Sequence, residues 1–254
     1  MCFANNWVGW QIVGWLRERE EDIAAVVIHP PERQRHVREI LKAAGVPREA
    51  VFEGSRLAQP EVRDAVLALK PDLGVSLMFG YVLSRELLRG FPAGVINVHP
   101  SLLPHNRGAY PNVWSIIEGT PAGVSLHYVD DRLDAGDLIA QRVVAVEPVD
   151  TGETLYRRLE RASVELFQEL WPAIRDGRAP RTPQPAGIGA THRIRDVDAM
   201  DRIDVTRQYA AGELLNILRA RTFPPFRGAF IEVGGRRVYL SLGLEYGDEE
   251  QGRS

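Results

Sequence analysis

The first half of the chain alternates short apolar runs with amphipathic segments, which is the pattern of parallel strands joined by crossover helices. Apolar runs predict strands at 24–29, 73–79 and 95–98, with a weaker one at 50–52. Helical spacing of apolar residues covers 7–19, 31–44 and 60–69. The residues before Asn5 leave room for only a very short first strand, unless the true start lies upstream. The pattern predicts an α/β fold with a mostly parallel sheet.

The pattern changes near residue 124. Residues 124–129 and 138–146 alternate apolar and polar positions, which predicts a pair of half-buried strands. Thr151 then reads as a helix cap, and apolar residues at helical spacing fill 155–174. Pro172 and Gly177 are expected to end this helix.

A segment rich in Pro, Gly and small residues follows, from 176 to about 190, and indicates a linker or an extended crossing segment. Beyond it, 206–220 is predicted to be a helix, and 228–233 and 236–242 to be strands joined by Gly234-Gly235. We therefore predict a catalytic domain at 1–180, a connector at 181–204 and a small C-terminal domain with a helix and a β-hairpin at 205–254.

Composition excludes several classes of protein. A hydrophobic fraction of 44% and a charged fraction of 26% are ordinary for a globular domain, and a net charge of −3 gives no electrostatic case for a nucleic-acid binder, which disfavours RNA substrates. The single Cys2 cannot form an internal disulfide, and no Cys/His cluster has zinc-site spacing. No apolar stretch is long enough to span a bilayer. We expect a cytoplasmic protein that binds no metal, nucleic acid or membrane.

Polar side chains stand where ligands usually bind in such a sheet. Asn97 and His99 lie at the carboxyl end of the strand at 95–98, and their spacing points both to the same side. The loop at 100–111 should close over that end. Asp134 lies in the turn between the later two strands. Taken singly, the pair also fits loop capping or a buried histidine, and an Asp in a turn is commonly a solvated turn former.

Asn97, His99 and Asp134 with the segments around them form a joint motif that is highly specific, unlike any one of its parts. The region from 79 to 154 resembles the formyltransferase family that uses 10-formyltetrahydrofolate, whose core is Rossmann-like. The resemblance is carried by residues 95–104, 107–108, 114–119, 123–127, 133–136 and 150–151. It implies that Asn97, His99 and Asp134 take the places of the family's catalytic Asn, His and Asp.

The family's reaction explains these residue types. An amine attacks the formyl carbonyl of the folate, and a tetrahedral oxyanion develops. Asn97 would supply a neutral donor to that oxygen and protonated His99 a charged one. Asp134 would favour the imidazolium form of His99 and accept, directly or through water, the proton that the attacking amine loses.

The resemblance also implies where the pterin ring of the folate binds. In the family an apolar slot at the end of a neighbouring strand clasps this ring largely through backbone groups, and Gly80 would permit a close approach. The positions that correspond here are Met78, Phe79, Gly80, Tyr81, Val82 and Leu133. The first five also fit a buried strand end before a helix start. His127 recurs in the family, but a histidine on an alternating strand is more often a packing residue, so we leave it outside the catalytic set.

Within the family, the chain is most similar to enzymes that formylate a nucleotide-linked amino sugar, as in surface polysaccharide or O-antigen biosynthesis. Residues 5–9, 106–114, 193–204 and 218–230 carry this closer resemblance. Arg107 is a candidate for a phosphate or sugar hydroxyl, and Trp7 and Tyr110 for stacking on a base or sugar. Surface packing explains each of the three equally well.

Four alternatives stay open. A methionyl-tRNA formyltransferase would carry a larger, basic C-terminal domain, and a formyltetrahydrofolate hydrolase would carry a regulatory domain for which the chain has no room. A purine-pathway transformylase lacks this form of extension after Asp176. A non-catalytic folate-binding protein is the fourth, because a fold does not guarantee an activity. The strand edges of the 228–242 hairpin would suit a second subunit, which makes a homodimer a further expectation.

Overall fold

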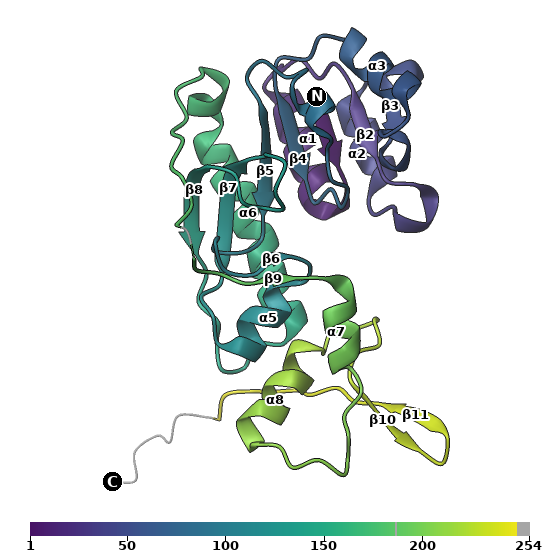
Figure 1. Ribbon diagram of the computed structural model, residues 1–254, viewed down its shortest axis with the longest axis vertical. Coiled ribbons are helices and arrows are strands. Elements are labelled where there is room, and N and C mark those ends of the chain that lie inside the picture. The colour runs from purple at the N-terminus through teal and green to yellow at the C-terminus, as the bar shows by residue number, and fades with distance from the viewer. Residues whose placement is uncertain (186, 248–254) are drawn as a thin grey trace.

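A seven-stranded sheet forms the body of the protein, in the order β3-β2-β1-β4-β5-β7-β8 (Figure 1). The computed structural model describes residues 1–185 and 187–247. β1 to β5 are parallel, β7 runs antiparallel to β5, and β8 runs antiparallel to β7. The predicted α/β fold with a mostly parallel sheet is confirmed. The strands are β1 (Cys2–Ala4), β2 (Val26–Ile28), β3 (Val51–Glu53), β4 (Gly74–Leu77), β5 (Val95–His99), β7 (Gly123–Tyr128) and β8 (Leu138–Val143).

The three-residue strand β1 lies at the centre of the parallel part and pairs with β2 on one side and β4 on the other. The chain builds outward from β1 through β2 to β3 and then returns to β4. The strand order therefore reverses between β1 and β4, and ligands of open α/β sheets bind at the carboxyl ends of strands at such a point. Asn5 and Met78 are the first residues beyond those two strand ends.

Alternation along each strand divides the core into two layers. Cys2 and Ala4 belong to a large cluster with α1 (Asn6–Glu18), α2 (Val37–Ala44) and α6 (Gly152–Arg175), whereas Phe3 belongs to a smaller cluster on the other face. That second face is covered by α3 (Pro60–Ala68) and α4 (Arg85–Leu88). Short 3-10 helices lie at η1 (Pro31–Arg33), η2 (Arg48–Ala50) and η3 (Gly54–Arg56).

Two predicted helices begin later than their apolar spacing indicates. The segment predicted as one helix at 31–44 is η1 followed by α2, because His36 adopts a left-handed conformation with φ of 55° just before Val37. The helix predicted at 206–220 is α8 (Ala211–Ala220). Ahead of it, the Asp204 carboxylate accepts hydrogen bonds from the backbone N–H and the hydroxyl of Thr206, which holds a turn instead of a helix.

Two helices contain a proline near one end. α6 continues past Pro172 and ends at Arg175, one residue beyond the predicted 174, since a proline so near the end of a helix removes only one of the last backbone hydrogen bonds. The helix α5 (Pro111–Glu118) is not among the predicted elements, although it begins with Pro111 at its first turn and ends at Gly119 with φ of 65°.

The chain crosses from α6 to a smaller C-terminal part, which lies at the far end of the molecule from the parallel sheet (Figure 1). Its elements are α7 (Ile194–Met200), α8, β10 (Phe230–Val233) and β11 (Arg236–Tyr239), and Ile203, Ile217 and Ala229 form a small core there. β10 and β11 pair around Gly234-Gly235, both with positive φ, so the predicted hairpin is confirmed. Residues 248–254 of the predicted C-terminal domain lie outside the described residues.

Within the described ranges, the helices are too short or too polar to cross a membrane. Whether the boundaries 1–180, 181–204 and 205–254 separate units that fold independently stays a prediction.

The central position of β1 leads to a stability prediction. Phe3 is fully buried and packs against Phe79 and Phe91, with ring centroids 5.4 and 5.9 Å away. Phe3→Ala should lower the free energy of unfolding by about 3–5 kcal/mol because it leaves a cavity in the second core layer. Val143→Ala, at a side chain that is 69% exposed, should change it by less than about 0.5 kcal/mol. Urea unfolding measures both, and equal effects would contradict this account of the core.

Candidate active site

Asn97 and His99 point to the same face of β5, as their spacing predicts. Ile96 and Val98, which alternate with them, belong to the large core cluster on the other face. The antiparallel partner β7 brings His127 opposite Asn97 and Ser125 opposite His99. The register between β5 and β7 therefore gathers polar side chains on one face while their neighbours enter the core.

His127 contacts Asn97 directly, a relation that the sequence does not reveal. The Nδ2 atom of Asn97 lies 3.1 Å from His127 Nε2, and His127 Nδ1 lies 2.9 Å from the carbonyl oxygen of Tyr128. Burial lowers the pKa of His127, against the opposing charge of Asp134, so the ring is neutral at pH 7. Neutral His127 donates from Nδ1 and accepts at Nε2, which leaves the second N–H of the Asn97 amide free for a ligand.

Asp134 faces both histidine rings. Its Oδ2 lies 3.7 Å from His99 Nδ1, and its Oδ1 lies 3.7 Å from His127 Nε2. Oδ2 also accepts a hydrogen bond of 2.9 Å from the backbone N–H of Gly108. Gly108 has φ of 87°, and a Cβ there would lie 2.3 Å from the carbonyl oxygen of His192. Glycine at this position thus lets the loop approach closely enough to hold the carboxylate.

The other nitrogen of the His99 ring faces a backbone oxygen. His99 is 6% exposed, and its Nε2 lies 3.3 Å from the carbonyl oxygen of Asn106. Asn106 is fixed in turn, because its buried amide donates to the hydroxyls of Ser115 and Thr120 at 3.0 and 2.8 Å. An oxygen therefore stands near each ring nitrogen of His99, and a proton on either nitrogen has a polar neighbour.

The residues expected to clasp a pterin ring follow β4. Met78 has φ of 55°, Phe79 packs against Tyr81 at a centroid distance of 5.4 Å, and the side chain of Val82 is 78% exposed. Leu133 is 49% exposed on the Asp134 turn. Leu77, the last residue of β4, pairs with Val98 of β5. The residues that follow these two, Met78 and His99, are therefore neighbours. The structure thus places this apolar strip beside the polar group of β5.

The backbone of Gly80 is held by His29, which follows β2. The backbone N–H of Gly80 donates to His29 Nε2 at 3.1 Å, and His29 Nδ1 lies 3.1 Å from Asn5 Nδ2. Burial, followed by the positive charge of Arg33, lowers the pKa of His29. A neutral His29 accepts from the Gly80 N–H at Nε2 and carries its own proton on Nδ1, so it connects the end of β2 to the residues after β4.

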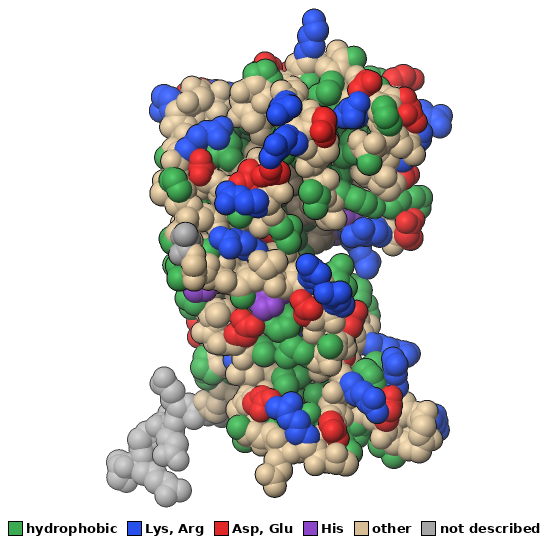
Figure 2. Space-filling model, in the orientation of Figure 1, with side chains coloured by type: hydrophobic (Ala, Val, Ile, Leu, Met, Phe, Trp, Pro, Cys, Tyr) green, Lys and Arg blue, Asp and Glu red, His purple; other side chains and the backbone are tan. Residues whose placement is uncertain are grey.

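The three residues considered for an acceptor substrate differ in their contacts and exposure. Arg107 donates to the Gln184 side chain at 2.6 Å, and Tyr110 is 43% exposed at the start of α5. Trp7 is partly buried and packs against the large core cluster. Of the two aromatic side chains, that of Tyr110 is the more exposed. Figure 2 shows a hollow between the sheet and the smaller part of the molecule, with Lys and Arg side chains at its border.

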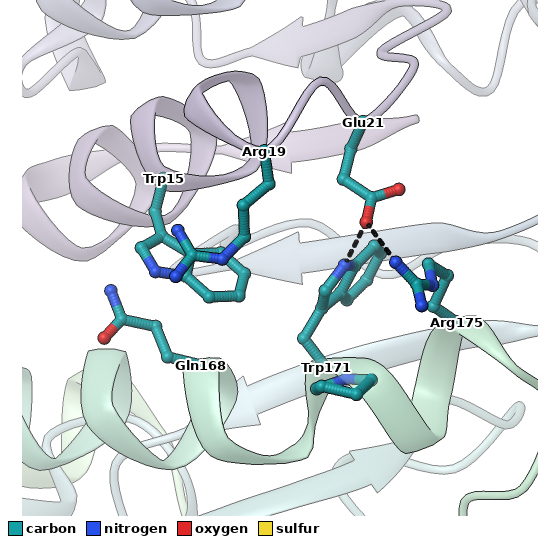
Figure 3. Close-up of a pocket in the computed structure, with 7 residues that line it drawn as sticks. Trp15, Arg19, Glu21, Gln168, Trp171 and Arg175 are labelled. Atoms are coloured by element: carbon teal, nitrogen blue, oxygen red, sulfur yellow. Dashed lines mark hydrogen bonds and ion pairs between the residues drawn. The ribbon is translucent and has the colours of Figure 1, made fainter.

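A separate hollow of about 380 Å³ lies between α1 and α6 (Figure 3). There, Glu21 Oε1 accepts a hydrogen bond of 2.7 Å from Trp171 Nε1 and lies 3.6 Å from Arg175 Nη1. α1 and α6 cover the face of the sheet opposite Asn97 and His99, so this hollow is distinct from the polar group of β5. Among the described residues, His, Cys, Asp and Glu side chains form no group of three able to hold a metal ion.

Two enzymes of known activity resemble the chain in sequence. It is 40% identical over 174 residues to the dTDP-4-amino-4,6-dideoxyglucose formyltransferase of Mycobacterium tuberculosis, covering 66% of this chain and 74% of that enzyme. It is 34% identical over 224 residues to the methionyl-tRNA formyltransferase of Myxococcus xanthus, covering 85% of this chain and 69% of that enzyme.

Two solved structures also resemble the chain. A Mycobacterium tuberculosis protein described as a candidate sugar N-formyltransferase superposes with a TM-score of 0.80 at 31% identity over 98% of both chains. The formyltransferase PseJ of Anoxybacillus kamchatkensis, solved with UDP-4,6-dideoxy-4-formamido-L-AltNAc and tetrahydrofolate, superposes with a TM-score of 0.56 at 35% identity. That match covers 68% of this chain and 87% of PseJ.

Known families match both the part of the chain that forms the sheet and the smaller C-terminal part. Residues 196–246 match the N-formyltransferase dimerization C-terminal domain. Residues 11–170, which include β5, β7 and the Asp134 turn, match the formyl transferase family. The chain belongs to the formyltransferase family.

Proposed function

We propose that this protein transfers a formyl group from 10-formyltetrahydrofolate to the primary amine of a nucleotide-linked amino sugar. One observation carries the chemical part of the proposal. Asn97 and His99 project side by side from the carboxyl end of β5, and the Asp134 carboxylate stands 3.7 Å from the His99 ring. A formyl carbonyl placed against this group meets donors on one side and a base on the other.

In the proposed reaction, the amine nitrogen forms a bond to the formyl carbon, and the carbonyl oxygen becomes an oxyanion. The free N–H of Asn97 donates to that oxygen, and the Nε2–H of protonated His99 donates to it in place of the Asn106 carbonyl. Asp134 accepts the proton that the amine nitrogen loses, directly or through water. The oxyanion then re-forms the carbonyl as the bond from the formyl carbon to the folate nitrogen breaks, and that nitrogen takes up the proton held by Asp134 and leaves as tetrahydrofolate.

The proposed folate site is the strip after β4 together with Leu133. Val82 and Leu133 expose apolar surface, and Gly80 leaves backbone accessible next to it. Such a strip suits the flat pterin ring, which needs both apolar contact and backbone hydrogen bonds. The tetrahydrofolate complex of PseJ supports a folate donor for this chain.

An amino sugar is the acceptor that the relatives favour. Both the Mycobacterium tuberculosis enzyme and PseJ are named for, or solved with, nucleotide-linked 4-amino or 4-formamido sugars. Tyr110, Arg107 and Trp7 stay candidates for contacts with the nucleotide or the sugar. The similarity to methionyl-tRNA formyltransferase keeps charged initiator tRNA as the second candidate acceptor, although a net charge of −3 gives no general electrostatic attraction for it.

We also propose a homodimer formed through the C-terminal part. Residues 196–246 match a dimerization domain, and Val233, Val238 and Tyr239 of the hairpin are 57%, 45% and 38% exposed. Exposed apolar side chains on a two-stranded sheet are the kind of surface that a second copy would cover. A cytoplasmic location and a role in surface polysaccharide biosynthesis complete the proposal.

Removal of each proposed catalytic group gives the first functional prediction. Asn97→Ala, His99→Ala and Asp134→Ala should each lower kcat by about 10²–10³-fold, the usual cost of losing one transition-state interaction. Asp131→Ala is a matched control, because its exposed carboxylate lies in the same turn and pairs with Arg85. Steady-state kinetics on variants with unchanged circular dichroism measure the effect. Wild-type turnover in any of the three would remove that residue from the mechanism.

The acceptor is identified by a substrate panel. The protein is incubated with 10-formyltetrahydrofolate and, separately, with dTDP-linked and UDP-linked 4-amino sugars and with methionyl-tRNA. Mass spectrometry should find one added formyl group on an amino sugar. Formylation of methionyl-tRNA with none on any sugar would replace the proposed acceptor, and no product with any amine would favour a folate-binding protein without activity.

The contact between His29 and Gly80 predicts an effect on folate use. His29→Phe removes the acceptor for the Gly80 N–H, so KM for the folate should rise about tenfold, as for a lost hydrogen bond of ordinary strength, while kcat changes little. His29→Gln offers a side-chain oxygen in place of Nε2 and should restore much of the affinity. Equal KM values in all three proteins would show that this contact does not shape the folate site.

His29 also predicts a pH dependence of stability. Its pKa in the folded protein lies below the ordinary value of 6.5, so the unfolded chain takes up this proton first as the pH falls. The contribution of His29 to stability is therefore complete above the unfolded pKa and is lost as the pH drops toward the folded one. The free energy of unfolding, measured with urea, should differ less between about pH 7.5 and about pH 5.5 for His29→Gln than for the wild type.

A further inference from the structure

The segment between α6 and α7 contacts both loops of the proposed active site. Thr182 exchanges backbone hydrogen bonds of 2.8 and 3.0 Å with Leu138 at the start of β8. Further along, β9 (Thr191–His192) pairs in parallel with β6 (Arg107–Gly108). In Figure 1 the chain passes along β8 before it reaches β6. The described residues of this crossing segment, 178–185 and 187–192, therefore join the loop that contains Gly108 to the turn that contains Asp134.

Gln184 makes the side-chain contacts at the middle of this segment. Its Nε2 donates to the carbonyl oxygens of Asp134 and Gly136, each at 2.9 Å. Its Oε1 accepts a hydrogen bond of 2.6 Å from Arg107 Nη2. Both amide protons and the amide oxygen are used. Because Arg107 can only donate, it fixes the amide with Nε2 toward the turn.

The turn that Gln184 holds has an unusual backbone. Asp134 has φ of 48°, a left-handed conformation that residues other than glycine adopt rarely, Asn and Asp among them. Gly136 fits only because it lacks a side chain, since a Cβ there would lie 1.9 Å from the carbonyl oxygen of Tyr128. A backbone of this kind persists where surrounding contacts determine it. Gln184 supplies two such contacts to the carbonyls, and Gly108 holds the carboxylate of Asp134 from the other side.

We propose that Gln184 is a positioning residue for formyl transfer, which sets the place of the Asp134 carboxylate through the backbone of residues 134–136. The proposal rests on the proposed function, because it gives Asp134 a catalytic task. Gln184 acts through Asp134 and does not contact the reacting atoms. The crossing segment is by this account part of the active site as well as the connection to the C-terminal part.

Two variants separate the donors of Gln184 from its acceptor. Gln184→Glu keeps the size and the oxygen that faces Arg107 but turns an acceptor toward two carbonyl oxygens. Gln184→Met keeps the length and removes both functions. Both variants should lower kcat on the order of 10–100-fold, as expected for a misplaced catalytic group, with KM for either substrate within about threefold of the wild type. Gln168→Glu on α6, in the hollow of Figure 3, is the matched control and should keep wild-type kinetics.

A second measurement does not depend on activity. The N–H of Gly108 bonds to Asp134 Oδ2, so its hydrogen exchange reports the position of the carboxylate. In Gln184→Glu, exchange at Gly108 should accelerate on the order of tenfold while the amide of Leu126 in β7 keeps its wild-type rate. NMR of the 254-residue chain resolves the two amides.

A lower kcat together with faster exchange confined to Gly108 would establish the positioning role of Gln184. Unchanged kcat, a rise in KM without a fall in kcat, or faster exchange at Leu126 to the same degree as at Gly108 would overturn the proposal. Failure of the wild type to formylate any amine would instead contradict the proposed function. In that case the exchange rate of Gly108 still shows whether Gln184 holds the Asp134 turn.

Discussion

Asn97 of β5 lies opposite His127 of β7. This register between the two strands determines which side chains enter the core and which form the proposed active site. Ile96, Val98 and Leu126 enter the large core cluster because the polar residues between them face the other way. A shift of one residue would exchange the two sets, burying Asn97 and His99 under α6 and exposing the apolar side chains. The hydrophobic effect that assembles the sheet therefore also holds the polar groups in place.

Around this register, the loops adopt conformations that strands and helices avoid. Asn6, Met78, Asn106, Tyr110 and Asp134 all have left-handed backbones, and all lie just beyond strand ends or in the loops over β5. Tertiary contacts hold such residues, as the bonds from Gln184 to the Asp134 turn show. Strained residues commonly concentrate where a protein binds or reacts, because rigid surroundings can maintain geometries that the free chain would not.

The sequence predicts the sheet and the hairpin because both depend on local periodicity and on glycines at defined turns. It also places Asn97 and His99 at a strand end, since that follows from the spacing alone. It does not reveal the partner of Asn97, because alternation identifies β7 as a strand without setting its register against β5. Gln184 escapes sequence reasoning for a similar reason. A glutamine in a Pro- and Gly-rich segment has no local pattern, and its role depends on residues about 50 and 77 positions away.

The position of β1 also bears on how the chain folds during synthesis. β1 comes shortly before β2 in the chain and can pair with it early, but its other neighbour β4 ends only at Leu77. Until the ribosome has released that segment, one edge of a short apolar strand lacks its partner. Long-range parallel pairing of this kind is slow, and an open apolar edge attracts other nascent chains. The strand at the centre of the parallel part of the finished sheet is thus one that is open to aggregation while the protein is being made.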